Sequence, residues 1–390
     1  MIIDPKINQI HSEIAAIRRD IHAHPEPGFK EVRTADLVAR YLTDYGLEID
    51  RGLGTTGVVG TLKNGTSGKS IGLRADMDCL VMEELNTFEH KSTVEGCMHA
   101  CGHDGHTAML LGAAKHLSET RNFDGTIHFI FQPAEEGLGG GREMVKEGLF
   151  KKFPVDGVYG LHNMPGYPVG QFSIKEGPMM ASSDSFNITV HGIGGHGAMP
   201  HRAVDPVLVA GELIVAFQSI VSRTLDPLQS AVIGVSQIHG GSADNVIPDD
   251  VLMAGTVRTF STEVQNHIEA RMQQIIDGVC LAHGATADFV FHRRYPPTVN
   301  HPQETLYAIE AACAVAGPDN VVSTGLPLMG GEDFSFMLLE KPGAYIFLGN
   351  GIGEGGCMVH NPHYDFNDEI IPLGIAYWTK LSENLLPRTG

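Results

Sequence analysis

The segment Met98-His99-Ala100-Cys101-Gly102-His103-Asp104-Gly105-His106 gathers a thiol and several imidazoles in one short run of the chain. Cys101 as a thiolate and His103 as a neutral imidazole suit zinc, cobalt or manganese, and the softness of sulfur favours zinc. Two interpretations are open at this point. The run either supplies part of a metal centre whose other ligands come from elsewhere, or it forms a structural zinc knuckle from Cys97, Cys101, His103 and His106.

Length and charge limit the class of protein. With 390 residues, the chain is long for a single hydrophobic core, so we expect two domains. The formal net charge of -19 opposes binding to the phosphates of nucleic acid and to an anionic membrane surface. We therefore expect neither nucleic acid nor a membrane among the partners.

Cysteine usage and apolar runs bear on the cellular compartment. The six cysteines lack the spacing of a disulfide framework, which fits a reducing compartment that preserves a metal-binding thiolate. No basic segment followed by an apolar core opens the chain, so no signal peptide is expected. The most apolar run, residues 204–221, contains Asp205, Glu212 and Gln218, which favours a buried or interface helix over a membrane span. The sequence thus predicts a cytoplasmic protein.

Alternating strand and helix patterns organise most of the chain. An amphipathic helix is expected after Asp4-Pro5, and a second helix over residues 33–45 should end at Gly46. Helical patterns also separate several strand-like runs, which lie at residues 58–62, 70–74, 127–131, 158–161 and 344–348. This alternation predicts an α/β domain with a mostly parallel mixed sheet and helices on both faces.

The pattern changes near Gly177-Pro178. Residues 185–190 alternate strictly between apolar and polar, as a half-exposed antiparallel strand does. The order β-α-β-β-α, with a last strand over residues 287–293, indicates a smaller α+β sandwich. We place this sandwich as an insertion over residues 178–292, so that residues 1–177 and 293–390 form the main domain.

Polar side chains follow several of the expected strands, where ligands bind in parallel sheets. These side chains are Asp76, Asp78, Glu135, Glu136, His162 and His360. The pair Glu135-Glu136 is the most informative, because it follows an apolar strand and precedes glycines that allow a ligand to approach the backbone. Adjacent carboxylates point in different directions, so one can bind a metal while the other does not. The alternative is a solvated acidic turn, but an independent metal-binding segment upstream favours a functional pair.

Further motifs lie along nearly the whole chain. They are Arg18-Arg19-x-x-His22-x-x-Pro25-Glu26-x-x-Phe29, Arg74-Ala75-Asp76-Met77-Asp78, Gln132-Pro133-Ala134-Glu135-Glu136, Leu161-His162-Asn163, Gly194-Gly195-His196-Gly197-Ala198-x-Pro200-His201, Asn245-x-Ile247-Pro248 and His360-Asn361-Pro362. Together with residues 99–106, this set resembles the M20 metallopeptidases, in the amidohydrolase branch of hippurate hydrolases, N-acyl-amino-acid deacylases and auxin-conjugate hydrolases. One departure is Cys79-Leu80-Val81, where relatives commonly have Ala-Leu-Pro.

The resemblance implies two divalent metal ions, either zinc, manganese or cobalt, and a set of ligands: Cys101, His103, Glu136, His162 and His360. It implies that Cys101 bridges the ions and that His103 and His162 hold one of them. Glu136 and His360 then hold the other. His363 competes with His360, which we prefer because it directly precedes Asn-Pro, as the ligand does in the family. Asp76 and Asp78 either orient a ligand imidazole or cap turns.

The resemblance also implies the groups that act on substrate. Glu135 would be the general base that deprotonates a metal-held water and passes the proton to the leaving amine. His196 would stabilise the oxyanion, often from a partner subunit, although a histidine in a glycine-rich loop is otherwise most often a surface residue. Asn245 and Arg258 are candidates for gripping the carboxylate of the substrate, and Arg258 is alternatively a surface strand residue.

We therefore expect a dinuclear metal-dependent amidohydrolase that cleaves hippurate-like or N-acetylated amino acids to a carboxylic acid and a free amino acid. A dipeptidase or exopeptidase of the wider M20 family is one alternative. A zinc-structured interaction protein is the other, but it has no use for Glu135 beside Glu136. By resemblance, the insertion is a lid and forms a homodimer or dimer-based tetramer. Its helix has an apolar face that could equally pack on its own sheet, made of Val209, Leu213, Ile214 and Phe217.

Overall fold

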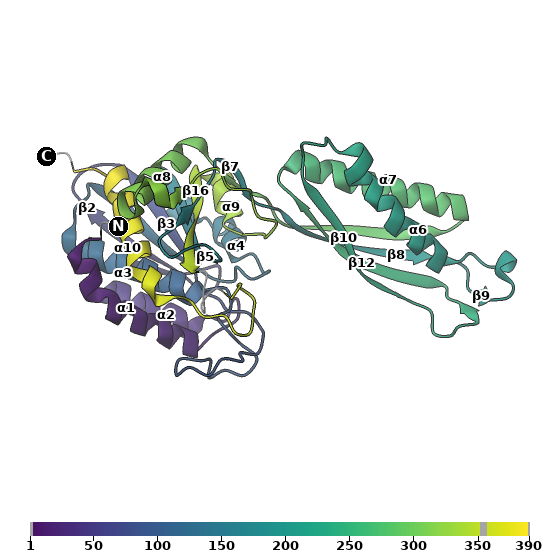
Figure 1. Ribbon diagram of the computed structural model, residues 1–390, viewed down its shortest axis with the longest axis horizontal. Coiled ribbons are helices and arrows are strands. Elements are labelled where there is room, and N and C mark those ends of the chain that lie inside the picture. The colour runs from purple at the N-terminus through teal and green to yellow at the C-terminus, as the bar shows by residue number, and fades with distance from the viewer. Residues whose placement is uncertain (1–2, 352–356, 389–390) are drawn as a thin grey trace. The chain divides into compact units, whose positions relative to one another are not determined.

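In the computed structural model, which describes residues 3–351 and 357–388, the chain forms two compact units (Figure 1). The larger unit comprises Met1–Met179, Val299–Leu326 and Asp333–Gly390. The smaller unit comprises Met180–Thr298 together with Pro327–Glu332, a short segment from later in the chain. Each unit has its own hydrophobic core.

A mixed sheet of eight strands forms the centre of the larger unit. Its strands lie in the order β1 (Glu48–Leu53), β2 (Gly57–Asn64), β4 (Gly125–Gln132), β3 (Ser70–Asp76), β5 (Gly157–Pro165), β16 (Gly343–Gly351), β6 (Phe172–Ser173) and β15 (Val321–Val322). The central strands β4, β3, β5 and β16 are parallel to one another, whereas β1, β2 and β6 pair antiparallel with neighbours. The prediction of a mostly parallel mixed sheet is confirmed.

Helices cover both faces of this sheet, as the sequence predicted. They are α1 (Pro5–Ala23), α2 (Val32–Asp44), α3 (His103–Thr120), α4 (Gly140–Lys146), α5 (Leu149–Lys152), α8 (Pro302–Ala316), α9 (Ser335–Glu340) and α10 (Ile371–Leu385). One face buries Ile71, Phe129 and Leu161 in a core shared with α1, α3 and α10. The other face meets the region before α9, where a Cβ on Gly160 would lie 2.6 Å from Tyr345 and 3.4 Å from Phe334.

Local sequence features explain the limits of the first two helices. The side chain of Asp4 accepts the N–H of Lys6 at 2.9 Å, and Pro5 occupies the first turn of α1. The isoleucines of this helix form the expected buried stripe, which consists of Ile7, Ile14, Ile17 and Ile21. Gly46, just beyond α2, has a φ of 81°, the left-handed conformation predicted for it.

The smaller unit is an antiparallel sheet of four strands with two helices packed on it. Its strands lie in the order β10 (Ala231–Gly240), β12 (Asp250–Thr259), β8 (Ser183–His191) and β13 (Thr286–Tyr295), and its helices are α6 (Pro206–Ser219) and α7 (Thr262–His283). Along β8, Phe186, Ile188 and Val190 are buried and alternate with more exposed residues. The predicted α+β sandwich is confirmed.

The apolar helix of the smaller unit is only partly covered. Among the described residues, Pro206–Thr224 is the one helix whose length and composition would allow it to cross a membrane, and 28% of its most apolar window is buried. Core helices meet the same criterion, and here Val209, Leu213 and Phe217 lie in the core of the unit. Val207, Leu208 and Val215 on the same helix are exposed.

Candidate metal centre

Cys101 and His103 flank a glycine at the start of α3. Gly102 has a φ of 92°, and a Cβ built on it would lie 2.3 Å from Asn163 Oδ1 and 2.7 Å from Tyr364 Oη. Only glycine fits this left-handed turn against neighbouring side chains. The turn buries Cys101 beside β5, where its Sγ lies 3.3 Å from His162 Nε2.

The structure brings all of the predicted metal ligands together. In one group, ligand atoms of Cys101, His103 and His162 lie within 4.8 Å of one another, and in a second group Cys101 is joined by Glu136 and His360. Cys101 is therefore common to both. A third group of the same tightness joins His103 and Glu136 to Glu135, which is also buried.

Hydrogen bonds leave the free nitrogens of the imidazoles facing this cluster. His103 Nδ1 lies 2.9 Å from the Asp78 carbonyl oxygen and 3.2 Å from its Oδ1, so Nδ1 carries the proton. His162 Nδ1 likewise donates to the Asn163 carbonyl oxygen at 2.5 Å. The Nε2 atoms thereby face the cluster, and they could bind a cation when the imidazoles are neutral and carry their proton on Nδ1.

Two buried atoms in the cluster fit a bound cation. Among the described residues, His103 Nε2 has no hydrogen-bond partner, although buried polar atoms nearly always have one, and Glu136 Oε1 has only the His360 Nε2 atom near it, at 3.4 Å. Burial and then His106 lower the pKa of His162 well below its ordinary value, which keeps its ring neutral. Burial and Glu136 raise the pKa of the Cys101 thiol, a cost that a cation at this sulfur would offset.

The carboxylates that follow β3 have different partners. Asp78 binds His103, a candidate ligand, and its Oδ2 also accepts the N–H of Glu136 at 2.9 Å. Asp76 accepts from His106 Nδ1 at 2.6 Å and from the guanidinium of Arg74 at 2.7 Å. Of the two roles left open by the sequence, orientation of a ligand imidazole therefore fits Asp78, whereas Asp76 supports the neighbouring His106.

A strained residue precedes the Glu135-Glu136 pair. Ala134 has a φ of 55°, a left-handed conformation that costs a residue other than glycine about 1–2 kcal/mol. Its N–H donates a hydrogen bond to Glu31, and its carbonyl oxygen accepts one from the N–H of Gly140 at 2.9 Å. Backbone strain of this kind persists only where surrounding contacts hold it, and it occurs often at functional sites.

A buried ionic network lies behind the start of α3. Asp104, the residue after His103, accepts from His22 Nδ1 at 2.8 Å and lies 3.4 Å from Arg18 Nη1. Arg18 also pairs with Asp365 and Asp368 at 2.8 Å. The sequence motif contained Arg18 and His22 but did not show what they contact, because their partners lie far along the chain.

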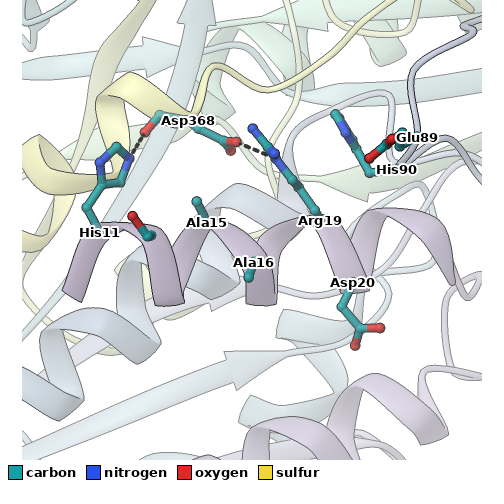
Figure 2. Close-up of a pocket in the computed structure, with 9 residues that line it drawn as sticks. His11, Ala15, Ala16, Arg19, Asp20, Glu89, His90 and Asp368 are labelled. Carbon is teal, nitrogen blue, oxygen red and sulfur yellow. Dashed lines mark hydrogen bonds and ion pairs between the residues drawn. The ribbon is translucent and has the colours of Figure 1, made fainter.

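This network extends to a pocket on the outer side of α1. Figure 2 shows His11 and Arg19 of α1 both bonded to Asp368. The pocket has a volume of about 530 Å³, and His90 and Glu89 also line it. None of the predicted metal ligands lies along it, so it is separate from the metal centre.

The other predicted site residues lie in the smaller unit. His196, in β9 (Gly195–His196), is exposed and pairs with Val246 of β11 (Val246–Ile247). Asn245 directly precedes β11, and its carbonyl oxygen accepts the N–H of Gly197 at 2.8 Å, so it lies beside His196. Arg258 is on β12, where its Nη1 donates to the carbonyl oxygens of Asp184 and Val257 at 3.2 and 3.0 Å.

The larger unit thus brings soft and hard candidate ligands together with one further buried carboxylate. Water activation by a metal ion needs both elements, ligands that leave the ion electrophilic and a carboxylate that can accept a proton. By fold and by site, the chain is a metal-dependent hydrolase.

Comparisons with known proteins identify the family. Residues 72–384 match peptidase family M20/M25/M40. The chain is 44% identical to the hippurate hydrolase of Campylobacter jejuni over 98% of this chain and 99% of the relative. It is 41% identical to thermostable carboxypeptidase 2 of Saccharolobus solfataricus over 94% of each chain. The chain belongs to the M20/M25/M40 peptidase family.

A solved structure agrees with this placement. The YXEP protein of Bacillus subtilis, described as a dinuclear metal binding peptidase from the M20 family, matches with a TM-score of 0.85 and 33% identity. The match covers 97% of this chain and 99% of that protein. The family resemblance predicted from the sequence motifs is therefore confirmed.

His22 gives a prediction about stability. Burial alone would lower the pKa of His22, but Asp104 and Glu84 raise it to about 9. Because this value lies above the ordinary 6.5, the stabilisation by charged His22 is complete below pH 6.5 and is lost as the pH rises through 9. The advantage of metal-free wild type over His22→Gln in unfolding free energy should shrink by up to about 3 kcal/mol across this range. Urea unfolding at several pH values measures it, and an advantage that does not shrink contradicts a charged His22.

Proposed function

We propose that the chain hydrolyses the amide bond of N-acyl-amino acids, hippurate-like or N-acetylated, to a carboxylic acid and a free amino acid. The observation that carries this proposal is the placement of Glu135, whose carboxylate lies within 4.8 Å of ligand atoms of His103 and Glu136. The hippurate hydrolase at 44% identity supports the same chemistry.

Two divalent cations fit the ligand set. The geometric groups support a division in which His103 and His162 hold one ion, Glu136 and His360 hold the other, and Cys101 bridges them. The dinuclear relative at 33% identity supports the number of ions. When bound, the ions supply Lewis acidity that polarises the amide carbonyl and lowers the pKa of water. Zinc, manganese and cobalt all suit these ligands, with the thiolate favouring zinc.

The residues of the chain supply proton transfer and orientation. Glu135 accepts the proton of the attacking water and delivers it to the amide nitrogen, which leaves poorly unless it is protonated. Asp78 holds the Nδ1 proton of His103 and the N–H of Glu136, and so keeps both ligands in position. Burial excludes competing water around Glu135, which is 8% exposed.

The smaller unit carries the proposed substrate-binding groups. We assign His196 to the oxyanion of the tetrahedral intermediate, and Asn245 and Arg258 to the carboxylate of the substrate. The pairing of β9 with β11 supports a joint role for His196 and Asn245, since it places them side by side. For Arg258, binding of a carboxylate would have to compete with the carbonyl oxygens that its Nη1 now contacts.

We further propose that the smaller unit is a lid that forms a homodimer or dimer-based tetramer. The exposed apolar side chains of α6, which include Val207, Leu208 and Val215, support an interface there. Strand β10 lies at the edge of the sheet, where it can pair with another strand. A cytoplasmic location completes the proposal.

A carboxypeptidase is the second candidate function. The relative named thermostable carboxypeptidase 2 is 41% identical, so peptide substrates also deserve a test. Both reactions release an amino acid that carries a free carboxylate, and they differ in the group on the other side of the amide. A non-enzymatic zinc protein would hydrolyse neither kind of substrate.

The first experiment tests Glu135 and the substrate class together. Glu135→Gln should abolish release of amino acids while metal content stays near the wild-type value. The side-chain amide of glutamine cannot accept a proton from the attacking water. The assay uses a panel of N-benzoyl, N-acetyl and N-indoleacetyl amino acids and dipeptides, after chelation and return of zinc, manganese or cobalt. Glu143→Gln on α4 is a matched control. Substantial residual turnover by Glu135→Gln would refute the general-base role, and preference for dipeptides would favour the peptidase.

The second experiment tests the bridging ligand. Cys101→Ala should lose both ions rather than one, because the thiolate is common to both ligand groups. Metal content per chain, measured by elemental analysis after dialysis, gives the answer. Cys313→Ala on α8 is the matched thiol control and should keep both ions. A Cys101→Ala protein that retains both ions contradicts bridging.

The third experiment concerns His196. His196→Ala should lower kcat/KM by about 100-fold or more, the usual effect of removing one oxyanion donor. His191→Ala, on β8 of the same unit, is the control and should keep its activity. If His196→Ala stays within a few-fold of wild type in steady-state kinetics, the oxyanion role is wrong.

A further inference from the structure

Glu31 is a buried carboxylate for which the proposed chemistry has no role. It lies directly before α2 and is fully buried in the larger unit. Its Oε1 accepts the N–H of Ala134 at 2.8 Å, and its Oε2 accepts the hydroxyl of Thr56 at 2.6 Å. The carboxylate therefore contacts the segment that carries Glu135, although the two positions lie 103 residues apart in sequence.

The contact falls on the strained residue of that segment. The φ of Ala134 is 55°, so its backbone needs external support to stay in this conformation. Gly28 also packs against Ala134, and a Cβ on Gly28 would lie only 3.0 Å from Ala134 Cα and Cβ. The residues just before α2 thus fix Ala134 through one hydrogen bond and one close packing contact.

Glu135 lies between two anchored peptide groups. On one side, Glu31 holds the N–H of Ala134, and on the other side Asp78 holds the N–H of Glu136 at 2.9 Å. With both neighbours fixed, the direction in which the Glu135 side chain leaves the backbone is also fixed. A displacement of a catalytic group by about 1 Å can lower the rate about 100-fold.

We propose that Glu31 is a positioning residue, which holds the backbone at Ala134 and thereby keeps the Glu135 carboxylate in its reactive orientation. The inference rests on the proposed role of Glu135 as general base. It assigns a reason for a buried carboxylate at this position, since a residue that only filled space would not need two acceptor oxygens.

The neutral form of Glu31 can also accept the hydrogen bond from Ala134. Burial raises the pKa of Glu31 to about 7, despite the hydrogen bond from Thr56. A neutral carboxyl group keeps an oxygen that accepts the N–H of Ala134, and the hydroxyl of Thr56 can serve as donor or acceptor. Glutamine at this position therefore preserves the contact, whereas alanine removes it.

Glu26 offers a matched control on the same segment. Its carboxylate also accepts two hydrogen bonds, from the N–H groups of Arg33 at 3.0 Å and Thr34 at 2.8 Å. These groups belong to the start of α2 and not to the segment of Glu135. Glu26→Ala thus removes a similar number of contacts without releasing Ala134.

The experiment compares Glu31→Ala, Glu31→Gln and Glu26→Ala in the metal-loaded enzyme. Glu31→Ala should lower kcat between tenfold and about 100-fold, with KM and metal content close to wild type. Glu31→Gln should recover kcat to within about threefold of wild type, and Glu26→Ala should lower the melting temperature with kcat nearly unchanged. In the metal-free proteins, hydrogen exchange of a peptide spanning Ala134 should accelerate in Glu31→Ala alone.

The outcomes separate this inference from the proposed function. If Glu135→Gln is inactive while Glu31→Ala keeps wild-type kcat and exchange, the positioning role is wrong and the general base stands. If Glu31→Ala and Glu26→Ala lose kcat equally, the effect is general destabilisation and the inference is also wrong. Should Glu31→Ala not fold, Glu31→Asp shortens the side chain and withdraws the carboxylate from the N–H of Ala134; it should lower kcat several-fold, and an unchanged kcat overturns the proposal.

Discussion

The carboxylate of Asp78 joins two of the segments that supply the candidate metal centre. It holds the Nδ1 proton of His103 at 3.2 Å and the N–H of Glu136 at 2.9 Å. One side chain after β3 therefore connects the start of α3 with the segment after β4. Because ligands from separate strands must converge within a few ångströms, a group that binds two of these segments sets the geometry of the whole site.

Charge balance around the centre follows from two buried arginines. Arg74 pairs with Asp76 and Asp333, and Arg18 pairs with Asp104 and with acidic residues before α10. Removing one partner of a buried pair leaves an uncompensated charge, which costs about 3–5 kcal/mol. Although the chain has a net charge of -19, two of its arginine side chains are buried in the interior, close to residues that contact the candidate ligands.

The sequence predicted the sheet, and its motifs contained the candidate ligands, because both follow local rules. Apolar runs followed by polar residues marked β3, β4 and β5, although His162 lies inside β5, and the motifs contained Glu135 and the five candidate ligands. The supporting contacts could not be predicted in this way. The bond from Ala134 to Glu31 depends on how α2 packs against the sheet, and no spacing rule connects residues so far apart. For Arg258, the residue type alone suggested binding of a substrate carboxylate. In the structure its Nη1 contacts backbone carbonyl oxygens, which the sequence could not show.

The protonation of the ligands links metal binding to pH. Burial raises the pKa of the Cys101 thiol, and although burial would lower the pKa of His103, the charge of Asp76 raises it well above its ordinary value. These directions favour the protonated forms of both groups in the metal-free protein, so on the proposed assignment each would give up a proton on binding a cation. His162 is already neutral, so it binds without releasing a proton. If a cation binds at Cys101 and His103 as proposed, it replaces protons there, and the affinity for metal should therefore rise with pH.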